Sequence, residues 1–203
     1  MSADDVDILE KTTSFQGYFR IDRYVLKFRR FDGGWSSAVS REIFERGHAV
    51  GLILYDPARD HVGLCEQFRP GALAAGWHPW LIEIPAGIID EGQTPESVAI
   101  REAKEETGIE IDEVVPARRY LVTPGGSSES MQLFAARFDS TLLKGVHGLE
   151  EEAEDIRVFP LPAEEAFSWI ESGRICNAMT IIALEWLAKH RDALRARWAG
   201  TTV

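Results

Sequence analysis

The sequence predicts an α/β (α+β) sandwich with a mixed sheet, because strand-like runs and helical segments alternate along the chain. Strand-like runs at 48–56 and 61–69 flank the turn sequence PAR, and the run at 80–87 alternates apolar and polar residues. A helical pattern follows at 95–107, and helical apolar spacing fills 177–198. The sandwich is completed by strand-like runs at 117–123, 130–138 and 156–161 and a helix at 162–173.

The N-terminal region is expected to form a β-hairpin of its own. Strand-like runs at 17–28 and 37–47 flank the sequence DGGW, which favours a turn. We therefore expect two parts, an N-terminal hairpin subdomain at 1–46 and a main domain at 47–203.

Composition and charge argue against several classes of function. The 203 residues are 45% hydrophobic and carry a net charge of −11, so nucleic acid, which needs a basic surface, is not expected as a partner. The first residues, MSADDVDILEK, lack the basic segment followed by an apolar segment that is typical of a secretory signal. The apolar run AMTIIALEWLA is too short to cross a bilayer. Cys65 and Cys176 have no metal-ligand spacing and predict free thiols. We expect a soluble, cytoplasmic protein without a membrane partner.

The helix expected at 95–107 has well-marked ends. Thr94 suits the N-cap, and Pro95 suits the first helical position because its missing N–H costs nothing there. Gly108 suits the left-handed residue that ends a helix.

Three glutamates crowd the last turns of this helix. Glu102, Glu105 and Glu106 fall within an arc of roughly 100°. Glu102 and Glu106 are i,i+4 neighbours that repel each other, and a hard divalent cation would reverse that penalty. Arg101 precedes Glu105 by four residues and can pair with it. A solvated acidic face is the alternative, but it does not account for Arg101 or for the glycine-rich lead-in.

The stretch 87–109 resembles a Nudix box. The resemblance implies a strand-loop-helix on an αβα Nudix sandwich, and hydrolysis of a nucleoside diphosphate linked to another moiety. One position departs from the pattern, because Gln93 stands where the box has Glu. The fixed positions are occupied here by Gly87, Arg101, Glu102, Ala103, Glu105, Glu106, Gly108 and Ile109.

The resemblance also assigns roles to residues of the box. Glu102 and Glu106 would be metal carboxylates, and Ala86 would add a backbone carbonyl. Glu105 would be a nearby ligand or proton handler in catalysis, oriented by Arg101. The implied cofactor is Mg²⁺, with Mn²⁺ as the alternative.

Segments outside the box resemble the bacterial ADP-ribose pyrophosphatase subfamily over about 15–198, among them SREIFERGHA, EQFR, TPGGSSE and GVHGLEEEAEDIRV. This resemblance implies a homodimer with an exchanged N-terminal hairpin. Arg69 would contact phosphate, while Tyr18 and Arg41 would reach the substrate from the other subunit. The alternatives are surface salt bridges for the arginines and interface packing for Tyr18.

Four more residues complete the implied substrate site. Gly125 and Gly126 would admit close backbone approach, although a flexible turn also accounts for them. Glu129 would accept hydrogen bonds from a ribose or base. Ile88 is a candidate contact at the base, and neither Ile88 nor Glu129 alone settles which base is bound.

The acidic run at 150–155 would, by itself, indicate a solvated loop. The resemblance makes Glu152 the general base that takes a proton from the attacking water, and Glu154 a further metal ligand. Glu151 lies beside Glu152 and is the alternative base.

The expected activity is hydrolysis of the ADP-ribose diphosphate to AMP and ribose 5-phosphate. The nearest alternative is the same reaction on another nucleoside diphosphate sugar, such as GDP-mannose. A ligand-sensing Nudix module without catalysis is a further alternative, for which Gln93 would be a sign.

Overall fold

The computed structural model describes residues 1–199, except for the side chain of Glu152. The described chain forms two compact units. Unit 1 contains Met1–His48 and Leu121–Ser130, and unit 2 contains Ala49–Tyr120 and the residues from Met131 onward. The segment 121–130 therefore joins the N-terminal unit, although it lies between two strands of the main sheet in sequence.

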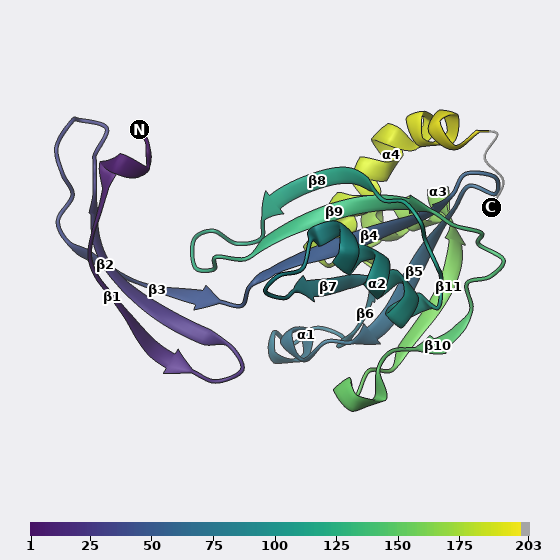
Figure 1. Cartoon of the computed structure of the whole chain (residues 1–203), viewed down its shortest axis with the longest axis horizontal. Coiled ribbons are helices and arrows are strands. Elements are labelled where there is room, and N and C mark those ends of the chain that lie inside the picture. The colour runs from purple at the N-terminus through teal and green to yellow at the C-terminus, as the bar shows by residue number, and fades with distance from the viewer. Residues whose placement is uncertain (200–203) are drawn as a thin grey trace. The chain divides into compact units, whose positions relative to one another are not determined.

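Unit 1 is an antiparallel sheet in the order β1-β2-β3 (Figure 1). Its strands are β1 (Val6–Gln16), β2 (Arg20–Phe28) and β3 (Val39–Glu45). The pairing of β2 with β3 confirms the expected hairpin. The sequence did not predict β1, because all eleven of its residues are exposed and carry no burial pattern.

Unit 2 is built on a mixed sheet, as predicted. The main path of the sheet runs β10-β11-β5-β4-β9-β8, with β6 paired to β5 and β7 paired to β4. β4 is antiparallel to β5 and parallel to β9. The strands are β4 (His48–Asp56), β5 (His61–Phe68), β6 (Trp80–Glu83), β7 (Ala86–Ile89), β8 (Val115–Leu121), β9 (Ser130–Arg137), β10 (Gly145–His147) and β11 (Ile156–Pro162).

The described helices include the three that the sequence predicts. Those expected at 95–107, 162–173 and 177–198 correspond to α2, α3 and α4. None of the described helices is long and apolar enough to cross a membrane. The helices are η1 (Ala3–Asp5), α1 (Pro70–Ala74), α2 (Pro95–Thr107), η2 (Glu150–Glu152), α3 (Ala163–Glu171) and α4 (Ala178–Trp198).

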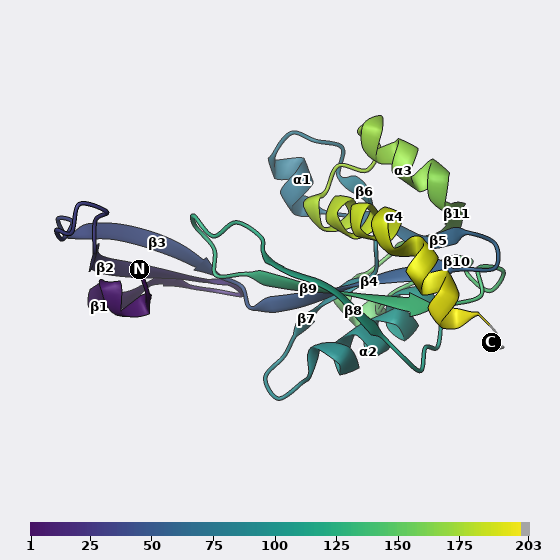
Figure 2. The same ribbon diagram turned by 90° about the horizontal axis from the view of Figure 1, so that it is seen from above.

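Two hydrophobic cores lie on opposite faces of the unit 2 sheet, because successive strand residues point to opposite faces. Leu52 of β4 packs in a buried cluster with Ala103 of α2. Its neighbour Ile53 packs in a second cluster with Leu184 of α4. Figure 2 shows α2 on one face of the sheet and α3 and α4 on the other. The catalytic candidates of α2 therefore lie on one side of this sheet, which we call the α2 face.

The strand expected at 80–87 is divided into β6 and β7. Pro85 lies between them and has no N–H to donate to a ladder. Its carbonyl accepts the Leu52 N–H at 2.8 Å, so the chain stays attached to β4 as it changes partner. The break brings the start of β7, at Ala86, next to α2.

Candidate active site

Both ends of α2 are fixed by the residues that the sequence indicated. The Thr94 side chain accepts the Ser97 N–H at 3.2 Å, and Gly108 has a left-handed φ of 70°. Gly108 donates its N–H to the Lys104 carbonyl at 2.9 Å. These caps fix where α2 begins and ends.

Glu106 is the most deeply buried acid of α2. It is 2% exposed, and its Oε2 accepts the Ala86 N–H at 2.9 Å. Burial raises the pKa of Glu106 to about 8, although the Ala86 N–H opposes the shift. The negative charge of Glu102 raises it further. Without a cation, burial therefore favours the protonated form of Glu106.

Glu102 lies one turn before Glu106 and is also buried. Burial raises the pKa of Glu102 to about 7, against the lowering effect of Arg101, and the charges of Glu105 and Glu154 add to the rise. Arg101 Nη2 lies 2.8 Å from Glu102 Oε1, and its Nη1 pairs with Glu105, as the four-residue spacing predicts. One arginine thus holds two of the three glutamates.

Gly87 makes room for Glu102. A Cβ at position 87 would lie 1.8 Å from Glu102 Oε1 and 2.6 Å from its Cγ. A side chain here would therefore displace the Glu102 carboxylate, and only glycine fits.

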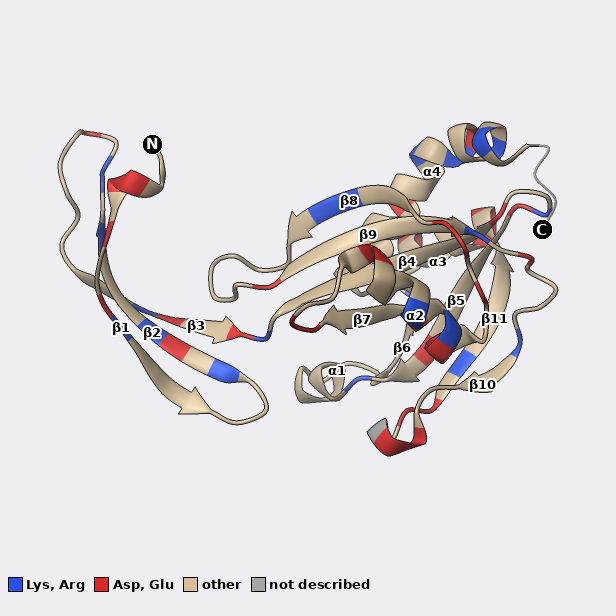
Figure 3. Cartoon of the chain, viewed as in Figure 1, with Lys and Arg blue, Asp and Glu red and all other residues tan. Residues whose placement is uncertain are grey.

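Glu154 reaches the same glutamates from the acidic loop after β10. Its charge contributes to the raised pKa of both Glu102 and Glu106. Its Oε2 accepts the Leu149 N–H at 3.1 Å, and Gly148 donates its N–H to the Glu105 carbonyl at 3.3 Å. The loop is therefore tied to the end of α2. Figure 3 shows the acidic residues of this loop and of α2. The Glu152 side chain lies outside the described residues, so its role as a base stays a prediction.

The chemistry of this cluster fits a divalent cation. Glu102 and Glu106 are buried carboxylates whose charged forms a cation would stabilise, and the charge of Glu154 lies within electrostatic range of both. As placed, no three acidic, histidine or cysteine side chains of the described chain form a ready metal site. Each carboxylate instead has a protein donor, namely Arg101 for Glu102, Ala86 for Glu106 and Leu149 for Glu154.

Arg69 lies at the end of β5, where it begins α1. Its Nε and Nη2 both lie 2.8 Å from Glu83 Oε2. Ile88, the other substrate candidate in unit 2, lies half-buried in β7. The sequence did not single out Glu83, although one acid in the apolar run WLIEIP was a signal.

Unit 1 carries the remaining candidates. Tyr18 is 87% exposed, and Arg41 Nη1 donates to the Ser40 carbonyl at 2.8 Å. Gly126 in the 121–130 segment accepts the Phe44 N–H at 2.8 Å through its carbonyl, while Gly125 is exposed.

Glu129 is 7% exposed and lies 3.4 Å from Arg46 Nη1. Arg46, which sequence reasoning passed over, also lies over the Phe19 ring, 5.7 Å from its centroid. A second arginine in SREIFERGHA was the available signal.

A model of the NUDIX domain family matches residues 45–174, which is more than half of the chain. The chain belongs to the NUDIX domain family. The ADP-ribose pyrophosphatase of Escherichia coli K12 is 45% identical over 195 residues, which cover 96% of this chain and 93% of that protein. The GDP-mannose pyrophosphatase of Pectobacterium atrosepticum is 34% identical over 191 residues, covering 91% and 97% of the two chains.

A solved structure described as an ADP compounds hydrolase matches the NUDIX chain with a TM-score of 0.73. It covers 96% of this chain and 98% of its own, at 20% identity, and so supports the fold. Gln93, which departs from the box, accepts the Asp90 N–H through its Oε1 at 3.2 Å. It therefore closes the turn before α2 rather than joining the acidic cluster.

Proposed function

We propose that this NUDIX protein hydrolyses the diphosphate of ADP-ribose, with water, to AMP and ribose 5-phosphate. The buried pair Glu102 and Glu106, with raised pKa values, carries the hydrolase part of this proposal. The substrate follows from the 45% identity to an ADP-ribose pyrophosphatase over 96% of the chain. GDP-mannose is the second candidate, because a GDP-mannose pyrophosphatase is 34% identical.

The carboxylates Glu102, Glu106 and Glu154, with the Ala86 carbonyl, would hold a divalent cation, Mg²⁺ or Mn²⁺. Such a cation neutralises the charge of a diphosphate and stabilises the charge that develops on it. Arg101 keeps Glu102 and Glu105 in place, and its charge partly offsets theirs.

The attacking water needs a base beside the cluster. We assign this role to Glu152, which lies two residues before Glu154 in a loop tied to the end of α2. The products follow from breaking one phosphorus–oxygen bond of the diphosphate, with the water oxygen added to one phosphate.

The substrate itself would be held by arginines and by the 121–130 segment. Arg69 would bind the diphosphate, since a guanidinium offers planar donors with a permanent charge. Ile88, Gly125, Gly126 and Glu129 would contact the rest of the nucleotide.

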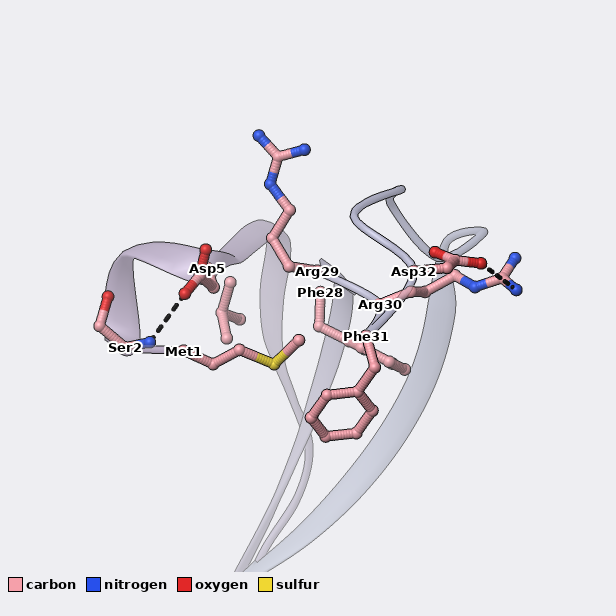
Figure 4. A pocket seen from close by; sticks show the side chains of 9 residues that line it. Met1, Ser2, Asp5, Phe28, Arg29, Arg30, Phe31 and Asp32 are labelled. Atoms are coloured by element: carbon pink, nitrogen blue, oxygen red, sulfur yellow. Dashed lines mark hydrogen bonds and ion pairs between the residues drawn. The ribbon is translucent and has the colours of Figure 1, made fainter.

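A homodimer is part of the proposal, because unit 1 lacks a core of its own. No apolar side chain of the described residues 1–48 is buried, while Ile8, Phe15 and Phe31 are 56%, 60% and 99% exposed. A three-stranded sheet without a packed face needs a partner surface. A hollow of about 550 Å³ lies in this unit. Figure 4 shows Met1, Phe28 and Phe31 among the side chains that line it. A second copy would cover such surface, with Tyr18 and Arg41 reaching its active site.

Cytoplasmic location is proposed from the thiols. Cys65 and Cys176 are both unpaired, which suits a reducing compartment.

The activity is tested by incubating the purified chain with Mg²⁺ or Mn²⁺ and ADP-ribose, GDP-mannose, UDP-glucose or NADH. We expect AMP to form fastest from ADP-ribose. Faster turnover of GDP-mannose would move the substrate assignment to that nucleotide sugar, and no turnover of any compound would contradict the hydrolase.

The exchanged dimer is tested by mixing two inactive variants, Arg41→Ala and Glu106→Gln. If Arg41 serves the partner's site, each mixed dimer contains one site with both residues intact, and activity returns on subunit exchange. If both residues serve the same subunit, every site of the mixed dimer keeps one defect and activity stays lost.

A further inference from the structure

Glu83 is a buried acid in the otherwise apolar strand β6, and it lies on the α2 face of the sheet. It is 5% exposed, and its neighbours Ile82 and Ile84 belong to the core on the α4 side. Its partner across the ladder is Cys65, which belongs to the core on the α2 side. Because side chains alternate along a strand, the Glu83 carboxylate shares a face with Glu102 and Glu106.

The Glu83 carboxylate holds one edge of the Arg69 guanidinium. Two donors of Arg69, Nε and Nη2, lie 2.8 Å from the single oxygen Oε2, and Gln67 Nε2 reaches the same oxygen at 3.5 Å. The contact of Nε and Nη2 with one carboxylate oxygen determines which edge of the guanidinium faces Glu83. The third nitrogen, Nη1, has no hydrogen-bond partner among the described residues, and the Arg69 side chain is 40% exposed.

Arg69 also lies within electrostatic range of the metal-binding candidates. Burial lowers the pKa of Arg69, but the charges of Glu83 and then Glu106 raise it. The guanidinium therefore stays charged while it presents one edge beside α2.

We propose that Glu83 is a positioning residue, which holds Arg69 so that its free edge binds the diphosphate of the substrate. The inference rests on the proposed function, because it assigns Arg69 to the diphosphate. Preorganisation of a long side chain removes the entropy that its ordering would cost on binding. Glu83 itself would repel a phosphate, so it improves binding only through Arg69.

Glu83 helps binding through Arg69 and opposes it through its own charge. The effect of removing Glu83 should therefore depend on whether Arg69 is present, which a merely structural ion pair does not predict. In the natural chain, Glu83→Ala releases Arg69, and we expect KM for ADP-ribose to rise on the order of tenfold with a smaller change in kcat. In an Arg69→Ala background, Glu83 has nothing to position. There, Glu83→Ala leaves KM unchanged or lowers it, because an unpaired carboxylate near the phosphates is removed.

Glu66 offers a matched control. It lies one residue after Cys65 on β5, on the opposite face from Glu83, and pairs with Arg157. Glu66→Ala also removes a glutamate–arginine pair, but KM should stay within about twofold of the natural value. If circular dichroism shows that Glu83→Ala does not fold, Glu83→Gln replaces it in both backgrounds. A smaller rise in KM is then expected in the natural chain.

The inference would be overturned if Glu83→Ala raised KM equally in the natural chain and in the Arg69→Ala background. It would also be overturned if Glu83→Ala left KM unchanged in the natural chain. Binding of inorganic pyrophosphate with Mg²⁺, measured by calorimetry, keeps the inference testable if ADP-ribose is not hydrolysed. Weaker pyrophosphate binding by Glu83→Ala, only when Arg69 is present, would support positioning even though the proposed function had failed. Unchanged pyrophosphate binding would overturn it.

Discussion

The backbone N–H of Ala86 and the carboxylate of Glu106 are joined by a hydrogen bond of 2.9 Å. This bond links the first residue of β7 to the last turns of α2, twenty residues later in the chain. The same bond brings Ala86, whose carbonyl is a candidate metal ligand, next to the Glu106 carboxylate, which is another. The start of β7 and the end of α2 therefore form one part of the site.

Glu106→Gln separates catalysis from stability. The amide keeps an oxygen for the Ala86 N–H but loses the charge. We expect turnover of ADP-ribose to fall at least about a hundredfold, since a carboxylate that would hold the cation is lost. The thermal midpoint in EDTA at pH 8 should stay level or rise, because no buried charge remains at position 106. Turnover near the natural value would contradict a metal role for Glu106.

The stability of the metal-free protein should fall as pH rises from about 5 to 8. The folded-state pKa values of Glu102 and Glu106, about 7 and about 8, are above the ordinary carboxyl value. Their stabilising contribution is therefore full below the unfolded pKa and is lost as pH rises through the folded pKa. The measurement is the thermal midpoint in EDTA, compared at each pH with Glu106→Gln, whose midpoint should fall less. A constant difference between the two proteins would count against the raised pKa of Glu106.

Local signals were enough to predict α2, because its caps, its pairing of Arg101 with Glu105 and its acidic arc all depend on residues within a few positions. Mixed-sheet architecture also followed from the order of strand-like runs. By contrast, the role of Glu83 depends on its position opposite Cys65, and strand register is not evident from either run alone.

Exposure and distance in sequence account for the other omissions. β1 has no buried residue, so no periodicity marked it. The packing of Gly126 against Phe44 joins segments more than eighty residues apart, and it places the 121–130 segment in unit 1. Neither feature has a local signature.

Gly87→Ala should disrupt the site without disturbing the helix. The added Cβ would overlap Glu102 Oε1, so the carboxylate must leave its place beside Arg101. We expect at least about a tenfold loss of turnover and a higher Mg²⁺ requirement, both measured by metal titration of the activity. Gly71→Ala is the matched control, because nothing lies within 4 Å of its added Cβ. Equal activity of the two variants would show that Glu102 moves at no cost.

The base is identified by comparing Glu152→Gln with Glu151→Gln. Both changes keep the size of the side chain and remove one charge from the same loop, so each serves as the control for the other. We expect Glu152→Gln to lower kcat at least about a hundredfold with little change in KM, since a general base acts in the chemical step. Loss of activity only in Glu151→Gln would move the base to Glu151.

Gln93→Glu restores the residue that the box has at this position. Gln93 bonds through Oε1 to the Asp90 N–H, and a glutamate supplies the same acceptor with a charge added. The residue lies in the turn before Thr94, outside the helical arc of Glu102, Glu105 and Glu106. We therefore expect turnover of ADP-ribose to change by less than about threefold, measured at saturating Mg²⁺ and at several lower concentrations. A large gain, above all at low Mg²⁺, would show that position 93 contributes to cation binding and that glutamine impairs the natural site.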